Sequence, residues 1–229
     1  MSFFLEGMGE ALRLLFAGNA EVWCAVWISV KVAGLSTSIA ALVGLPIGFL
    51  VATGRFAGRR CVVVLLNTLM GLPTVVVGLV IYGMLSRRGP LGELGLLYTP
   101  AAMVIGQVIL ATPIIAALSY GAVAGLDSRV LKSAYALGAG ALRAAWTAFR
   151  ELRPALSAAV VAGFGRVFAE VGVSLMLGGN IRFYTRNITT TIALETTKGE
   201  FALGLALGVV LLAVAFTVNL GFHLLKGSA

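Results

Sequence analysis

The sequence alternates long uncharged stretches with short charged ones. Three long stretches carry no charged side chain, and two more carry only one or two charges. About 20 mostly apolar residues are enough for an α-helix to cross a bilayer. We therefore predict five membrane-spanning helices, over residues 27–53, 61–86, 100–123, 154–177 and 201–225. Lys31 lies in the first predicted span, and Arg166 and Glu170 lie in the fourth.

Residues 1–22 precede the first predicted span and differ from it in pattern. Glu6 and Glu10 come before the first basic residue, Arg13, so the segment lacks the basic start of a secretory signal peptide. Its apolar side chains fall roughly on one helical face, which favours an amphipathic helix on the outer surface of the membrane. No repeat of about 20–50 residues divides the remainder. We therefore expect residues 23–229 to form one all-α membrane domain.

The composition agrees with a membrane protein and excludes most soluble classes. Hydrophobic residues make up 59% of the chain and charged residues 11%, with a mean hydropathy of +1.01. Soluble chains carry about 25% charged residues. The net charge of +8 would suggest a nucleic-acid partner only if a solvated basic face displayed it. We therefore expect the chain to contact the lipid bilayer and no nucleic acid.

The distribution of Lys and Arg predicts the orientation. With five spans, nine of these residues fall on the side of the C-terminus and seven on the side of the N-terminus. Five of the nine lie between residues 129 and 153, and cytoplasmic loops carry an excess of basic residues. The pattern thus predicts an N-terminus outside, a cytoplasmic C-terminus and a cytoplasmic loop over residues 127–153.

The predicted loop 127–153 has the composition of two short helices. Asp127 can cap a helix over 128–137, and the Gly-Ala-Gly of residues 138–140 ends it. A second helical run, 141–152, comes before Pro154, which is expected to begin the fourth span. One interpretation is a solvated basic connector that fixes the topology. The other is a docking element that offers aromatic and Arg side chains to a partner subunit.

A resemblance favours the docking interpretation. Lys132-Ser133-Ala134, followed after three residues by Gly138, occupies the place of a Glu-Ala-Ala-(three residues)-Gly motif. That motif is found in permease subunits of bacterial ATP-binding-cassette (ABC) importers, where its loop docks onto the ATPase. In this sequence Lys replaces the Glu and Ser replaces the first Ala. The resemblance implies an ATPase-coupling loop that contains Lys132, Ser133, Ala134, Gly138, Ala139, Gly140 and Arg143.

A closer resemblance lies in the C-terminal third. Residues 178–181 (Gly-Gly-Asn-Ile), 185–186 (Thr-Arg) and 189–199 (Thr-Thr-Thr-Ile-Ala-Leu-Glu-Thr-Thr-Lys-Gly) are similar to the permeases of bacterial tungstate importers, a group near the molybdate permeases. Together with the five predicted spans and Leu72-Pro73-Thr74, the likeness extends over nearly the whole chain.

This resemblance implies a type I ABC importer permease fold in the bacterial plasma (inner) membrane. It also implies a homodimer with the path at its two-fold interface, two copies of a cytoplasmic ATPase that binds ATP-Mg, and an external substrate-binding protein. The resemblance favours tungstate as the cargo, and the alternative is molybdate, which has nearly the same size and charge, or another tetrahedral oxyanion. A stand-alone channel, a secondary transporter and a membrane scaffold are the alternatives. A secondary transporter needs ionisable residues inside the membrane to couple transport to an ion, and Glu170 is the one acidic residue inside a predicted span.

The sequence contains no visible catalytic machinery, so we expect a transport subunit and not an enzyme. The phosphate-binding pattern G-x-x-x-x-G-K-[ST] is absent, which assigns ATP hydrolysis to a partner chain. The single histidine, His223, fits an interfacial position near the end of the fifth span better than the position of a ligand. Cys and His residues lack metal-site spacing, and we expect no metal or cofactor on this chain.

Polar residues near and within the spans are candidates for the translocation path. Arg166 and Glu170 lie four residues apart, and they either pair structurally or line the path. Neutral N–H and O–H donors suit an anion that must also be released. The candidate donors are Gln107, Asn180, Thr189, Thr190 and Thr191. The threonines have an alternative role as caps of a polar turn, and Arg182 and Arg186 can raise the local anion concentration.

Glycine and proline patterns predict close and kinked helix packing. Three G-x-x-x-G patterns, which begin at Gly44, Gly121 and Gly204, allow helices to approach closely. Proline residues at positions 46, 73 and 113 interrupt the first three predicted spans, and proline inside a membrane helix produces a kink. Both patterns suit a bundle that moves between two states as well as a static bundle.

Overall fold

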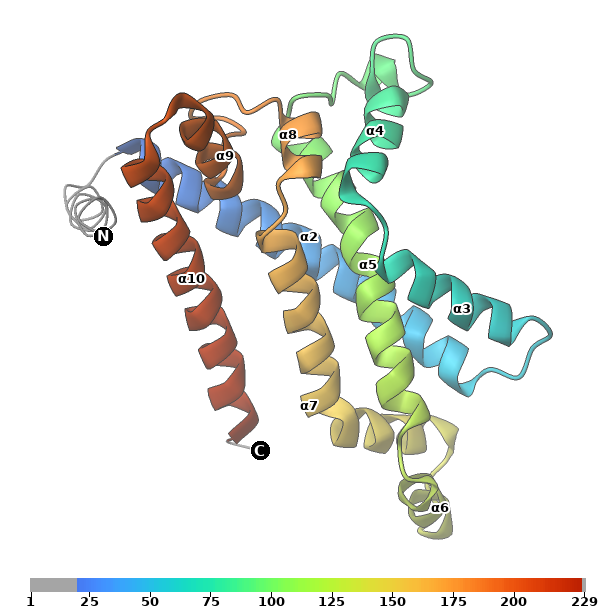
Figure 1. Cartoon of the computed structure of the whole chain (residues 1–229). Coiled ribbons are helices and arrows are strands. Elements are labelled where there is room, and N and C mark those ends of the chain that lie inside the picture. The colour runs from blue at the N-terminus through green and yellow to red at the C-terminus, as the bar shows by residue number, and fades with distance from the viewer. Residues whose placement is uncertain (1–19, 228–229) are drawn as a thin grey trace.

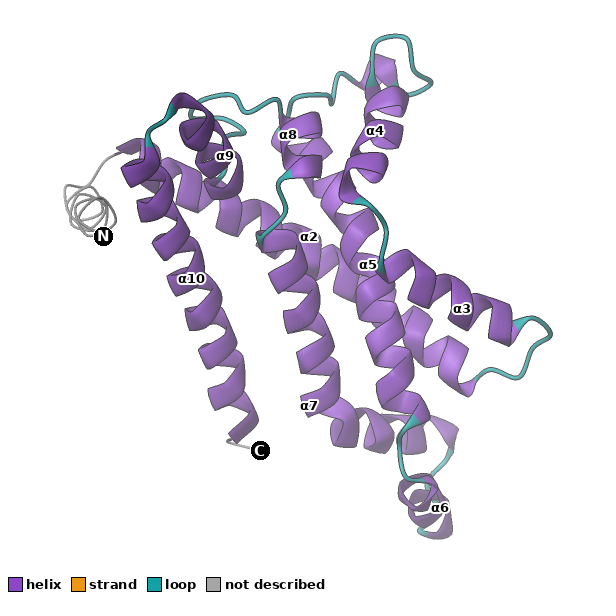
Figure 2. Ribbon diagram, viewed as in Figure 1, coloured by secondary structure: helices purple, strands orange, loops and turns teal. Residues whose placement is uncertain are grey.

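The computed structural model describes residues 20–227, and all of the regular secondary structure in this range is helical (Figure 1 and Figure 2). The predicted amphipathic segment 1–22 lies outside this range except for its last three residues, which form the first turn of α2. The elements are α2 (Ala20–Thr53), α3 (Arg59–Met70), α4 (Thr74–Leu85), the 3-10 turn η1 (Gly92–Leu94), α5 (Pro100–Ala124), α6 (Ser128–Ala136), α7 (Ala141–Phe168), α8 (Gly172–Gly178), α9 (Ile188–Lys198) and α10 (Phe201–Gly227).

Three of these helices are long and apolar enough to cross a membrane by themselves, namely α2, α5 and α10. Two further pairs qualify when each pair is taken together. The α3–α4 pair is bent by 97° and the α7–α8 pair by 59°. The described residues therefore contain three candidate spans, or up to five if each bent pair is one span. The all-helical prediction is confirmed, whereas the count of five spans and the orientation of the termini stay predictions.

The second predicted span, 61–86, is not one continuous helix. α3 ends at Met70, and the N–H of its C-cap Gly71 donates to the carbonyl of Thr68 at 3.1 Å. Pro73 then adopts an extended conformation, with φ −64° and ψ 118°, directly before α4. Proline has no N–H to continue a helix and disfavours helical backbone in the residue before it. The proline at position 73 thus produces a complete break between two helices.

The fourth predicted span, 154–177, is divided between two helices, and no helix begins at Pro154. α7 begins at Ala141, passes through Pro154 and ends at Phe168, so the predicted run 141–152 and the start of the predicted span form one helix. Figure 1 shows the first part of α7 lying across the lower end of the bundle and the rest running upward. Proline inside a helix removes one hydrogen bond and bends the axis without necessarily ending the helix. Glu170 lies beyond α7, in the break before α8.

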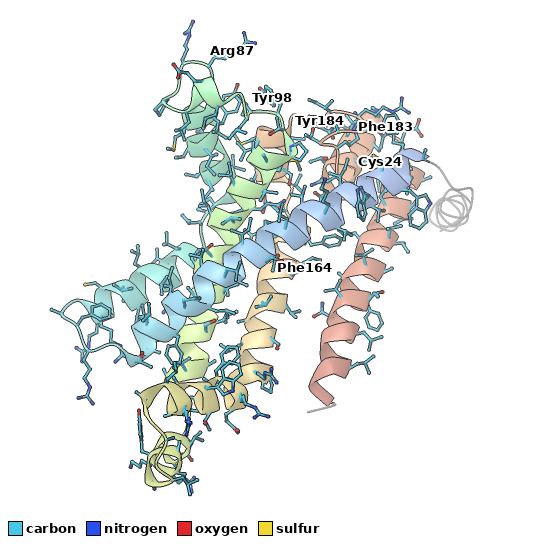
Figure 3. The ribbon with its side chains drawn as sticks, turned by 180° about the vertical axis from the view of Figure 1, so that it is seen from behind. Cys24, Arg87, Tyr98, Phe164, Phe183 and Tyr184 are labelled. Carbon is cyan, nitrogen blue, oxygen red and sulfur yellow. The ribbon has the colours of Figure 1, made fainter. Side chains whose placement is uncertain are left out.

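The centre of the bundle is the crossing of α2 and α5, which Figure 3 shows from behind. The first G-x-x-x-G pattern, Gly44 and Gly48, lies in this contact. A Cβ atom added at Gly44 would lie 3.0 Å from the carbonyl oxygen of Thr112, and one at Gly48 would lie 2.5 Å from that of Ala116. The other two patterns do not pack this way, since a Cβ at Gly121 or Gly208 would meet nothing within 4 Å.

Large apolar side chains remain exposed along the sides of the bundle. Leu42 on α2 is 77% exposed, and Leu212 and Phe216 on α10 are 71% and 68% exposed. α10 packs against α9 and α7 and stands at the edge of the bundle in Figure 1. Exposed apolar surface of this extent fits helices that face lipid or another protein chain.

Candidate functional site

The two helix breaks lie next to each other within the bundle. The first break covers residues 71–73, before α4, and the second covers residues 169–171, before α8. A Cβ atom added at Gly172, the first residue of α8, would lie 3.1 Å from Oγ1 of Thr74 and 3.3 Å from Oε1 of Glu170. α4 and α8 then pack side by side. The absence of a side chain at Gly172 therefore allows the two breaks to meet.

The predicted pair of Arg166 and Glu170 forms at this junction. Nη1 of Arg166 lies 3.0 Å from Oε2 of Glu170. The Glu170 side chain is 3% exposed and that of Arg166 is 39% exposed. The other carboxylate oxygen of Glu170 accepts the N–H of Val173 at 3.2 Å, and its backbone carbonyl accepts the Thr189 hydroxyl at 2.8 Å. The anion of the pair is thus buried and fixed, and the cation reaches the surface of α7.

The threonine cluster is engaged in hydrogen bonds within the chain. Asn187 caps α9: its Oδ1 accepts the N–H of Thr190 at 2.9 Å, and its own N–H donates to Oγ1 of Thr190 at 3.1 Å. The hydroxyl of Thr189, which donates to the Glu170 carbonyl, also lies 3.0 Å from Oδ1 of Asn187, and that of Thr191 donates to the Asn187 carbonyl at 2.6 Å. All three threonines are buried. These contacts match the interpretation of the threonines as caps of a polar turn.

Glu21 is a residue whose role the sequence did not reveal. Its carboxylate, at the start of α2, lies 2.8 Å from Nη2 of Arg182 and 2.7 Å from Nη1 of Arg186. Arg186 also donates to Oδ1 and to the carbonyl of Asn180, at 3.3 Å and 3.4 Å. Asn180 has a φ of 51° and Phe183 one of 61°, which non-glycine residues rarely adopt. Glu21 therefore holds a strained loop and partly neutralises the two arginines predicted to attract anions.

Gln107 links three helices in the protein core. The hydroxyl of Ser36 on α2 donates to Oε1 of Gln107 at 3.0 Å, and Nε2 of Gln107 donates to the hydroxyl of Ser174 on α8 at 3.1 Å. All three side chains are buried. A polar chain that is satisfied in this way ties α2, α5 and α8 into a fixed arrangement.

An aromatic pair lies at the same end of the bundle as α8 and α9. Tyr98, labelled in Figure 3, donates its hydroxyl to that of Tyr82 at 3.3 Å. This hydrogen bond raises the pKa of Tyr98 above its ordinary value of 10.0. The ring of Tyr98 also packs on Gly179, which has a φ of 67°. An open hollow of about 520 Å³ lies beside this pair.

A second feature is the elbow, which we define as residues 127–150: α6, the turn after it and the start of α7. Asp127 caps α6 by accepting the N–H of Arg129 at 2.8 Å. The helix ends in two bonds of 3.0 Å, from the N–H of Gly138 to the Tyr135 carbonyl and from the N–H of Ala139 to the Ala134 carbonyl. This is a Schellman motif, which requires a left-handed residue, and Gly138 has a φ of 80°. The predicted helix end at residues 138–140 is therefore confirmed.

The elbow projects from the lower end of the bundle in Figure 1, and several of its apolar side chains are exposed. Leu137 is 88% exposed, Leu142 is 86% exposed and Trp146 is 58% exposed, and the ring of Trp146 stacks on that of Phe149 at 5.5 Å between centroids. Of the predicted coupling residues, Ala134 is buried and Ala139 is half-buried, whereas the exposed ones are Lys132, Ser133, Gly138, Gly140 and Arg143. The elbow thus combines an apolar face with basic groups, a combination suited to a protein partner.

Within residues 20–227, no group of three or more His, Cys, Asp or Glu side chains is placed to hold a metal ion. The two cysteines, Cys24 and Cys61, are free. The side chain of His223 lies outside the described part of the chain, so its predicted interfacial position stays a prediction.

Comparisons with known proteins agree with this architecture. The chain is 39% identical over 219 residues to the tungstate uptake system permease protein TupB of Peptoclostridium acidaminophilum, covering 96% of each chain. It is 29% identical over 186 residues to the molybdenum transport system permease protein ModB of Azotobacter vinelandii, covering 78% of this chain and 82% of the relative. The fold resembles that of a chain in an inward-facing structure of the MetNI methionine ABC transporter, with a TM-score of 0.74, 16% identity and coverage of 91% and 95%.

The sequence profile of one family matches residues 44–226, which is most of the chain. The family is described as the inner membrane component of binding-protein-dependent transport systems. The predictions of a multi-pass inner membrane protein and of a transport subunit rather than an enzyme are confirmed by this match together with the apolar helices. The chain belongs to the family of binding-protein-dependent transport system inner membrane components.

Proposed function

We propose that this chain is the membrane-spanning permease of an ATP-driven importer of tungstate. The observation that carries the proposal is the 39% identity, over 96% of both chains, to a protein named as a tungstate uptake permease. The similarity to a relative named for molybdenum transport is lower, at 29%. Molybdate and other tetrahedral oxyanions form the alternative substrate class, because they are similar to tungstate in size and charge, the properties by which a permeation path distinguishes anions.

The proposed assembly contains two copies of this chain, with five spans each, an external N-terminus and a cytoplasmic C-terminus. The exposed apolar side chains of α2 and α10 support surfaces that face lipid and a second copy. Figure 1 places the elbow and the C-terminal end of α10 at the same end of the bundle, in keeping with a common cytoplasmic side. An external binding protein would deliver the anion at the opposite end, near Tyr98 and Asn180.

The elbow is the proposed contact with a cytoplasmic ATPase, which would bind ATP-Mg. It continues directly from α5 and directly into α7, so a push on the elbow is transmitted to both helices as a rigid-body movement. ATP binding would draw two ATPases together and turn the path outward, and hydrolysis would let it reopen inward. The exposed Leu137 and Leu142 are the anchors that we expect the ATPase to cover.

The proposed path follows the two-fold interface past the junction of the two helix breaks. Gln107, Asn180, Thr189, Thr190, Thr191, Arg166 and Glu170 stay its candidate residues. Most of them already use their polar atoms inside the chain. Arg166 is the candidate with the largest share of its side chain exposed beside the junction, so we propose it as the main contact for a passing anion.

The assembly can be tested by native mass spectrometry of the chain, purified in mild detergent after expression with its neighbouring genes. The proposal predicts a complex with two copies of this chain and two of an ATP-binding subunit. A monomer or homo-oligomer without an ATPase would favour a stand-alone channel and leave the elbow without its proposed partner.

The coupling role of the elbow predicts a specific effect of Gly138→Val. A side chain at a left-handed position costs about 1–2 kcal/mol, so the turn after α6 should distort and ATP hydrolysis should lose its stimulation by tungstate-loaded binding protein. Gly199→Val is the matched control, because Gly199 has a similar φ of 85° and equally open surroundings, but follows α9. It should cost similar stability and retain the stimulation. Equal stimulation in both variants would contradict the coupling role.

A further inference from the structure

The two members of the ion pair at the helix junction differ in exposure, which a purely structural pair does not require. Glu170 is buried, and its carboxylate is fixed by Arg166 on one oxygen and by the N–H of Val173 on the other. Its backbone carbonyl is bonded to Thr189 as well. These bonds hold the carboxylate firmly. The guanidinium, by contrast, keeps 39% of its side chain surface exposed.

Arg166 has donors to spare on its exposed side. A guanidinium carries five N–H donors, and in the described part of the chain its one hydrogen bond goes to Glu170. The neighbouring position is also open, since a Cβ atom added at Gly165 would meet nothing within 4 Å. Figure 1 shows the α7–α8 junction about midway between the two ends of the bundle. A group that passes along this side of α7 therefore meets free N–H donors at mid-depth.

We propose that Arg166 is an anion contact of the translocation path and that Glu170 keeps this contact weak. The inference rests on the proposed function, because it needs an oxyanion to pass. A guanidinium matches two oxygens of a tetrahedral oxyanion. At this depth an uncompensated cation would hold a dianion tightly, because charges interact strongly where water is scarce. The fixed negative charge 3.0 Å away opposes that attraction, and weak contacts are what conduction requires.

The variant that isolates this role is Glu170→Gln, which removes the negative charge while keeping the size and an oxygen that accepts the N–H of Val173. The probe is tungstate, measured by equilibrium dialysis with tungsten mass spectrometry on the purified permease–ATPase complex without binding protein. We expect Glu170→Gln to bind tungstate at least about tenfold more tightly than the unaltered complex, because a nearby repulsive charge is gone. Uptake into proteoliposomes should become slower, because release becomes slow.

Glu195→Gln is the matched control. Glu195 also pairs with a cation, Lys198, at 2.9 Å, and its side chain is 8% exposed. The Glu195–Lys198 pair lies within α9 and away from the junction, so its loss should leave tungstate affinity unchanged. If Glu170→Gln and Glu195→Gln give the same tungstate affinity as the unaltered complex, the pair is only structural and the inference is overturned.

A second variant keeps the test decisive if Glu170→Gln folds poorly. The double substitution Arg166→Gln with Glu170→Gln leaves two amides that can bond to each other and no buried charge, and it should lose the tight binding and reduce uptake. Arg166→Lys, which keeps the cation, should retain most of the uptake. Uptake by the double variant at the unaltered rate would overturn the inference. Failure of the unaltered complex to take up tungstate would instead refute the proposed function.

Discussion

The contact of α2 with α5 depends on Gly48, and a single methyl group there should be costly. In Gly48→Ala the new Cβ atom would lie 2.5 Å from the carbonyl oxygen of Ala116, 2.6 Å from Cβ of Ser119 and 2.8 Å from the backbone nitrogen of Tyr120. These atoms belong to the backbone or lie next to it, so none of them can rotate away. The two helices must therefore separate locally or bend.

The size of the effect follows from two opposing terms. Overpacking of a dense contact costs about 1–3 kcal/mol, and a backbone contact places Gly48→Ala in the upper half of that range. Replacing glycine by alanine inside a helix stabilises the folded state by about 0.5–1 kcal/mol. The net destabilisation is about 1–2 kcal/mol, which corresponds to a decrease of about 2–8 °C in Tm for a chain of this size.

Two matched variants separate packing from helix propensity. At Gly44 the nearest atom is 3.0 Å from the added Cβ, and at Gly121 nothing lies within 4 Å. Gly44→Ala should therefore fall between the other two variants, and Gly121→Ala should raise Tm, because only the propensity term acts there. The assay is the midpoint of thermal unfolding of the purified protein in one detergent. A Tm for Gly48→Ala equal to or above that for Gly121→Ala would refute the close contact of α2 and α5.

Three further substitutions test the polar contacts, and a fourth serves as a control. Gln107→Leu leaves Ser36 and Ser174 without their shared partner and should lower the stability by about 1–3 kcal/mol in the same unfolding assay. The control Asn67→Leu, at an exposed position on α3, should change the stability little. Equal effects of the two substitutions would argue against the buried hydrogen bonds of Gln107. Asn187→Ala removes the cap of α9 and should cost about 0.5–2 kcal/mol, and an unchanged Tm would contradict that role. Glu21→Gln should speed trypsin cleavage after Arg182 and Arg186, because the loop loses its charged anchor; cleavage at the unaltered rate would show that other contacts hold the loop.

Local signals predicted much of the fold. The end of α6 at residues 138–140 was predicted because a glycine after a helical run supplies the left-handed residue that a Schellman motif needs. The pairing of Arg166 with Glu170 was one of the two roles that their spacing left open, and the pair forms although Glu170 lies beyond the end of α7. Both features depend on a few consecutive residues.

The two prolines at 73 and 154 show where local signals fail. The first accompanies a complete break, because Gly71 caps α3 and residues 71–73 leave the helical conformation. The second lies inside α7, and the helix continues through it. Whether the chain resumes a helix after proline depends on what the next segment packs against, and sequence alone does not provide that information.

The candidate site was predicted only in part, again because the sequence does not show which distant residues lie together. From the sequence, the threonines after residue 188 are equally suited to be path donors or caps. Only the geometry of Asn187 shows that their hydroxyls are already hydrogen-bonded. Glu21 was missed because its partners lie 161 and 165 residues away. An ion pair between distant residues produces no periodic pattern in the sequence. The combination of a carboxylate at the start of a span, such as Glu21, with a basic loop elsewhere, such as that of Arg182 and Arg186, is nevertheless an indication worth testing.

The most direct test of the central claim is ATP-driven uptake of tungstate into proteoliposomes that contain this chain with its ATPase, with the binding protein outside. We predict that tungsten accumulates inside the vesicles and that this accumulation requires ATP, the ATPase and the binding protein together. Tungstate flux that proceeds without ATP or without the ATPase would contradict it and would identify the chain as a channel or secondary transporter instead.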